Sequence, residues 1–192
     1  MTRPRGRPGR EVATVSRDGM LTGALDLLGT LGAGGFTMRA LAARLGVTAM
    51  TLYHHFGDRD GLISAMADQA YRGVSDPGEG TPRRRIEGIL QAYYARVVNH
   101  PDLTLLIFGR PNALPAEALR ITEIIAQLLI DAGMTPQRSR LWVGILVDFT
   151  HGAAIAVAMA TNREGAAPDP RGDEYALALA ELMNGAIAAA AG

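Results

Sequence analysis

The chain contains no cysteine and no lysine among its 192 residues. The absence of cysteine excludes disulfides, thiol catalysis and cysteine-based metal sites, and it fits a protein of the cytoplasm. With no lysine, every basic residue other than histidine is an arginine, and the basic and acidic residues balance at a net charge of zero. Aromatic residues make up only 5%, but an apolar share of 48% is ample for a buried core of one large domain or two smaller ones.

No segment shows the sustained alternation of apolar and polar residues that a half-buried strand would have. Helical spacing recurs instead, so we expect an all-α fold. A first helix begins near residue 12 and is ended by the glycine-rich run at 32–35. Its apolar face consists of Leu21, Ala24, Leu25, Leu28 and Leu31. Thr37, Thr48 and Asp58 are expected to cap three further helices, and Gly46 to end the first of these. After a break at 74–82, rich in proline, glycine and acid, helices are predicted at 82–99, 102–110, 115–132, 135–161 and 173–190.

The neutral total hides an asymmetry, since residues 1–60 hold eight arginines and five acids. The first ten residues alone hold four arginines and no acid, with Arg5 and Arg7 flanking Gly6 between two prolines. No apolar run follows, so we expect a flexible basic arm and not a secretory signal. Flexible basic arms of this kind usually bind phosphate groups.

Residues 141–160 are nearly long and apolar enough to span a bilayer. Asp148 and His151, near the middle of this segment, would be costly in lipid. We therefore expect a buried or interface helix and no membrane partner.

Two helices of fewer than ten residues, joined by a glycine-containing turn, are predicted within residues 36–62. Helices this short need packing to be stable, and Leu41, Leu45, Leu52 and Phe56 supply apolar faces for it. This arrangement is typical of a helix-turn-helix, in which the second short helix enters the major groove of DNA.

This segment resembles the DNA-binding region of the Tet repressor family. The matching residues are Phe36, Thr37, Arg39, Leu41, Ala42, Leu45, Gly46, Val47, Thr51, Leu52, Tyr53, His55, Phe56 and Arg59. The segments NHPDL at 99–103 and AGM at 132–134 resemble the regulatory half of the tetracycline-type branch. The resemblance implies a homeodomain-like N-terminal domain, a helical ligand-binding and dimerisation domain, and a homodimer that binds a palindromic operator.

The resemblance also implies roles for individual residues. Arg39 should reach a phosphate or a guanine edge. Phosphate contacts are expected from Thr51, Tyr53, His55 and Arg59, with Thr48 and His54 beside them. Ala49 and Met50 occupy the base-reading positions, where they offer little hydrogen bonding.

The basic arm then has two open interpretations. PRGRP resembles the core of an AT-hook, in which Arg5 and Arg7 would lie in a narrow A·T minor groove. Alternatively, the arm attracts DNA without regard to sequence.

For the C-terminal half, the resemblance implies a small-molecule pocket, because apolar helices there carry scattered aromatic and polar side chains. The expected pocket residues are His100, Phe108, Asn112, Trp142, Phe149 and His151. Small and apolar residues at helical spacing predict a dimer interface. These are Gly152, Ala156, Ala160, Leu179, Leu182 and Met183.

We therefore predict a ligand-responsive transcriptional regulator, most often a repressor in this family, that is not an enzyme and needs no cofactor or metal. The expected units are an arm at 1–10, a DNA-binding domain at 11–58, a linking helix and loop at 59–81 and a regulatory domain at 82–192. The alternatives are an architectural, nucleoid-type protein without an effector, an activator, or a regulator that answers to a protein partner. Neither the His54–Asp60 segment nor His100 with a remote serine has the pattern of a metal site or a catalytic triad.

Overall fold

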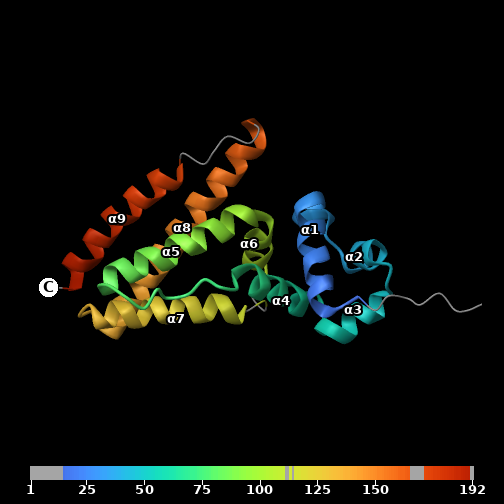
Figure 1. The fold of residues 1–192 in the computed structure, drawn as a ribbon, viewed down its shortest axis with the longest axis horizontal. Helices are drawn as coiled ribbons and strands as arrows, with labels where there is room; N and C mark the ends of the chain where they lie inside the picture. Colours follow the sequence, from blue (N-terminus) through green and yellow to red (C-terminus); the bar gives the residue numbers. More distant parts are fainter. Residues whose placement is uncertain (1–14, 111–112, 114, 165–170, 191–192) are drawn as a thin grey trace, which may run out of the picture.

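The computed structural model describes residues 15–110, 113, 115–164 and 171–190. Within this part every regular element is an α-helix, which confirms the predicted fold class. The helices are α1 (Arg17–Gly35), α2 (Met38–Leu45), α3 (Ala49–Phe56), α4 (Arg59–Tyr71), α5 (Pro82–Asn99), α6 (Pro101–Phe108), α7 (Ala116–Asp131), α8 (Pro136–Glu164) and α9 (Arg171–Ala190). Figure 1 shows α1–α3 at one end, α5 and α7–α9 at the other, and α4 between them.

Each helix at the N-terminal end begins directly after a residue whose side chain caps it. Ser16 Oγ accepts a hydrogen bond from the Gly19 amide, so α1 begins at Arg17, later than predicted. The predicted caps of α2–α4 are confirmed. Their side-chain oxygens accept from the amide three residues on, in the pairs Thr37–Ala40 (3.1 Å), Thr48–Thr51 (3.2 Å) and Asp58–Gly61 (2.7 Å). These bonds satisfy donors that a helix start leaves without an intrahelical partner.

A continuous apolar core joins α1–α4. Phe36, Leu41, Leu52 and Leu62 are each fully buried, with 0% of their surface exposed. The predicted face of α1 is partly confirmed, because Leu21, Ala24 and Leu28 are buried. Leu31 is not: it is 47% exposed, next to the kink where Gly32 adopts a φ of 67°.

The linking helix α4 contacts both ends of the molecule. It packs against α1 on one side and against α6 and α7 on the other. Asp60, in its first turn, pairs with Arg110 at 2.6 Å. Asp68 accepts a hydrogen bond from the Glu117 amide at 2.9 Å and so caps the start of α7, where Pro115 provides no side-chain cap. A shift of α4 would therefore be felt at both ends.

Helix α8 packs against α5, α7 and α9. Between Pro136 and Ala160 it is long and apolar enough to cross a membrane, with a mean hydropathy of 1.7. One third of its most apolar stretch is buried within the chain. The helix therefore packs along one side and leaves an apolar face with Leu141, Ile145 and Met159 exposed.

Candidate nucleic-acid interface and ligand cavity

Helix α3 presents an exposed face on a rigidly held backbone. Leu52 and Phe56 anchor its inner side in the core. On the outer side Met50 is 73% exposed and Tyr53 is 42% exposed, with His54 and His55 exposed beside them. Ala49 and Thr51 are half-buried, and Thr51 Oγ1 lies 2.9 Å from Thr48 Oγ1. A short helix with one side anchored in the core and the other side exposed has the shape needed to enter a groove.

Arg39 lies on α2 with its side chain exposed. It is therefore free to reach a phosphate or a base edge, as expected for the position. A further cation at this surface, Arg17, is not among the predicted site residues. Its guanidinium lies 5.2 Å from the centre of the Phe56 ring, at the end of α3, so α1 also brings positive charge to this surface.

Arg59 makes a contact within the chain that the sequence does not predict. Its Nη2 donates to the carbonyl oxygen of Phe36 at 2.8 Å, and its side chain is half-buried. Burial, together with the nearby charge of Arg110, lowers the pKa of Arg59 below its ordinary value. The side chain ties the start of α4 to the link between α1 and α2. This contact helps to position the α3 surface, and the expected phosphate contact of Arg59 stays a prediction.

Three predicted site residues lie outside the described residues. These are Arg5 and Arg7 of the basic arm and Asn112 of the expected pocket.

The cavities within the described part of the chain do not bring the other expected pocket residues together. His100 lines a small space of about 30 Å³ between α1 and the start of α6. His151 is nearly buried, with Nε2 2.7 Å from the Tyr93 hydroxyl and the Phe108 ring packed edge-on at 4.9 Å. Burial lowers the pKa of His151, which favours the neutral ring. Trp142 lies elsewhere, against Gly185 of α9.

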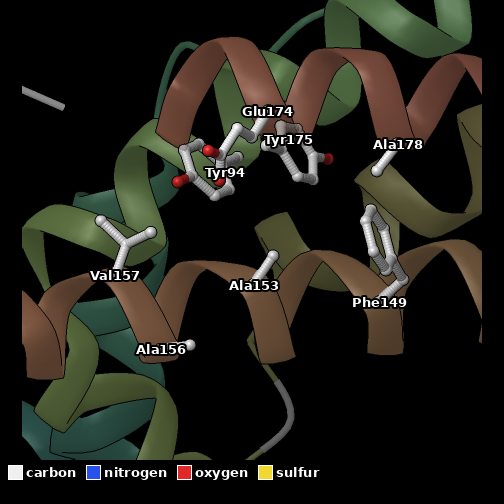
Figure 2. Close-up of a pocket in the computed structure, with 8 residues that line it drawn as sticks. All are labelled: Tyr94, Phe149, Ala153, Ala156, Val157, Glu174, Tyr175 and Ala178. Carbon is white, nitrogen blue, oxygen red and sulfur yellow. The ribbon is translucent and has the colours of Figure 1, made fainter. Parts of the chain in front are cut away.

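Two cavities, both larger than the space beside His100, flank a pair of stacked tyrosines that are not among the predicted site residues. Tyr94 of α5 and Tyr175 of α9 stack with ring centres 4.1 Å apart. One cavity, of about 460 Å³, lies between α8 and α9, and Figure 2 shows its lining, which includes Phe149 from the predicted set. The other, of about 480 Å³, lies between α5 and α9. No pattern local in sequence joins residues so far apart, so periodicity did not reveal them.

The predicted dimer residues divide into two groups. Gly152 and Ala156 are exposed, and Ala160 and Leu182 are half-buried. Leu179 and Met183 are corrected, because only 0% and 1% of their surfaces are exposed. They point into the chain's own core and leave no surface for a partner. The structure shows other exposed apolar residues on these helices instead, namely Leu141, Ile145 and Met159 on α8 and Leu177 and Ile187 on α9.

Among the residues that the structure describes, no group of three or more histidines and acids lies close enough to hold a metal ion.

Known proteins share both the sequence pattern and the fold of this chain. Residues 20–66 match the sequence pattern of bacterial regulatory proteins of the tetR family. A transcriptional regulator of the helix-turn-helix type from Saccharopolyspora erythraea is 32% identical over 132 residues, which cover 66% of this chain and 56% of that protein. The chain spans about half the length of the curated relatives it matches.

Solved structures resemble the chain over almost their whole length. BioQ with its double-stranded DNA operator aligns with a TM-score of 0.73 at 20% identity, over 91% of this chain and 99% of that one. BioQ from Mycobacterium smegmatis reaches a TM-score of 0.80 at 21% identity, over 91% of this chain and 99% of that one. A TetR variant from Acinetobacter baumannii in complex with minocycline aligns with a TM-score of 0.73 at 20% identity, over 90% and 96% of the two chains. The helix-turn-helix in α2 and α3 therefore has the sequence pattern of the tetR family of bacterial regulatory proteins, and the described helices share the fold of these solved structures.

Proposed function

We propose that the protein is a homodimeric transcriptional regulator that binds a palindromic operator through α3 and is released from it by a small molecule. The observation that carries this proposal is the capped, anchored helix α3 with Met50 and Tyr53 exposed at its surface. The operator complex of BioQ and the minocycline complex of TetR support the two partners by analogy. The similarity to a helix-turn-helix transcriptional repressor favours repression over activation, and the DNA partner implies action in the cytoplasm.

In the proposed complex, Met50 and Ala49 contact the edges of bases, where they can recognise the methyl group of thymine. Tyr53, His54, His55 and the hydroxyls of Thr48 and Thr51 contact phosphates, and Arg39 reaches a phosphate or a guanine. Residues 11–58 would form the DNA-binding domain, 59–81 the link and 82–192 the regulatory and dimerisation domain.

The basic arm supplies affinity that α3 lacks. Arg5 and Arg7 would lie in an adjacent minor groove and prefer A·T-rich sequence. Deleting residues 1–10 tests this: affinity should fall most for operators with A·T-rich flanks. An equal loss on all DNA would instead support a purely electrostatic arm.

A second copy of the chain would cover the open faces of α8 and α9. Gly152 and Ala156 allow close approach, and Leu141, Ile145 and Leu177 are too large and apolar to be left in water together. Leu177→Glu should yield monomers by light scattering. Leu119→Glu, which changes an equally large exposed residue on α7, should leave the dimer intact.

Release requires that the ligand bind more tightly to an arrangement of the dimer in which the two copies of α3 cannot both contact the operator. Helix α4 is suited to transmit that preference, because Asp60 and Asp68 tie it to the end of α6 and the start of α7. A ligand that moves these helices would move α4, and with it the spacing between the two copies of α3.

The decisive experiment isolates the DNA bound by the protein in the genome and measures affinity for that sequence against salt. A regulator should bind its operator about a thousandfold or more above random duplex, with affinity falling as salt rises. A ratio near one would favour the architectural alternative. A screen for compounds that release the complex then identifies the effector.

A further inference from the structure

We propose that the cavity between α8 and α9 binds a planar aromatic molecule that carries a positive charge. This proposal rests on the ligand-responsive function proposed above and adds the chemical class of the ligand.

The cavity is built around a column of nearly parallel rings. Tyr94 and Tyr175 stack at 4.1 Å, and Phe149 and Tyr175 at 5.6 Å, each pair with an interplanar angle of 11°. Figure 2 shows Tyr94 and Tyr175 on the α9 side and Phe149 rising from α8 toward them. A flat aromatic ligand gains more here than an aliphatic one of equal area, because it can continue an offset stack.

The central ring is fixed before any ligand arrives. Tyr175 is only 4% exposed, and its hydroxyl donates to the Leu90 carbonyl at 3.3 Å. The same hydroxyl lies 2.8 Å from Thr150 Oγ1, which is itself bonded to the Leu146 carbonyl. Because Tyr94 and Phe149 already stack on Tyr175, this fixed central ring holds the outer rings in place, and a ligand would extend the column from its outer end.

The space beside the rings is created by small residues. Ala153, Ala156 and Ala178 line the cavity with Val157, and the volume of about 460 Å³ lies within the range of small-molecule sites. Ala156 also belongs to the exposed face of α8, so the cavity lies next to the proposed dimer interface.

The charge of the lining selects the sign of the ligand. Glu174 is the only charged residue lining this cavity within the described part of the chain. The faces of aromatic rings are also negative, so a cation gains from both features and an anion is opposed by both. The neighbouring cavity between α5 and α9 carries Asp173, a charge of the same sign.

Thioflavin T, a flat aromatic cation, is a suitable probe for the full-length dimer in the absence of DNA. Its fluorescence should rise on binding, whereas the aromatic anion 8-anilinonaphthalene-1-sulfonate should bind at least about tenfold more weakly. Glu174→Gln should weaken thioflavin T binding about five- to tenfold while leaving a neutral analogue unaffected. Phe149→Leu should weaken both. Glu181→Gln is the matched control, because it removes an exposed carboxylate of the same helix that does not line the cavity.

Three results would overturn the proposal: equal or tighter binding of the anion, unchanged affinity in Glu174→Gln, or no binding to a folded dimer, as expected if the partner's side chains fill the space. A loss in Asp173→Asn but not in Glu174→Gln would likewise overturn it, by moving the ligand to the other cavity. Operator release is a separate readout. A dye that binds without releasing operator DNA leaves the cavity assignment intact and contradicts only the effector role.

Discussion

The N-terminal head of this protein, helices α1–α3, and its C-terminal half encode their sites in different ways. In the head, the proposed DNA surface is one helix of eight residues, set by caps such as Thr48 that act three residues away. In the C-terminal half, the proposed ligand site brings together Tyr94, Phe149 and Tyr175 from three helices. The first arrangement is local in sequence, whereas the second exists only after long-range packing. The predictions below probe each half and the links between them.

The largest effect is expected from Gly61→Ala in the first turn of α4. An added Cβ would lie 2.1 Å from the Phe56 carbonyl oxygen, which is backbone and cannot move aside cheaply. We expect a loss of about 3 kcal/mol or more in the free energy of unfolding, measured by chemical denaturation, together with loss of DNA binding.

Gly29→Ala is the matched control for that substitution. It also lies in a helix, and nothing within 4 Å would meet its Cβ. It should stabilise the protein by about 0.5 to 1 kcal/mol, because alanine loses less backbone entropy. Equal effects of the two alanines would contradict the proposed close packing of α4 against the end of α3.

Next in size are substitutions on the α2–α3 surface. Tyr53→Ala and Arg39→Ala should each weaken operator binding by roughly ten- to a hundredfold with unchanged thermal stability, because both side chains are exposed. Only Arg39→Ala should lower the slope of log affinity against log salt, by about one, if it contacts a phosphate. Fluorescence anisotropy at several salt concentrations measures both quantities.

Arg59→Met tests the positioning role of that arginine against the expected phosphate contact. Loss of the bond to the Phe36 carbonyl should cost about 2 kcal/mol of stability, while the salt slope of DNA binding stays close to that of the wild type. A normal melting temperature combined with a reduced salt slope would instead support the phosphate contact of Arg59.

The outcome for Arg59 shows what could be predicted from sequence and what could not. Helix periodicity and caps depend on neighbours within a few residues, so the sequence predicts the starts of α2–α4, the end of α2 and both ends of α5 closely. The role of Arg59 depends on a carbonyl 23 residues away in sequence. The residues next to Arg59 in the sequence do not predict that contact.

The proposed ligand cavity shows the same limit more strongly. Aromatic and polar side chains scattered over apolar helices predict a pocket lined by His100, Phe108, Asn112, Trp142, Phe149 and His151, of which Phe149 lines the proposed cavity. Folding instead places His151 against Tyr93 in a closely packed interior and opens space where alanines of α8 and α9 face two tyrosines. Small residues define a cavity by what they leave empty, which a pattern of chemical types does not reveal.

The smallest effect is expected from pH. Burial lowers the pKa of His151 in the folded chain below its unfolded value, and the same holds for His100. The unfolded chain therefore binds more protons as the pH falls through the unfolded value of about 6.5, so stability should decline from pH 7 to pH 5. His151→Gln should flatten this decline in a denaturation series, leaving the part due to His100. An unchanged slope would show that His151 is not held neutral.

The most direct test of the account replaces Met50 with a photo-crosslinking amino acid, because this residue is 73% exposed at the proposed groove-facing surface. Irradiation of the operator complex should link residue 50 to bases of the half-site, whereas the same replacement at Leu119 on α7 should give no DNA adduct. Crosslinks from position 119, or none from position 50 in a complex that still binds its operator, would contradict the assignment of α3 as the DNA-reading helix.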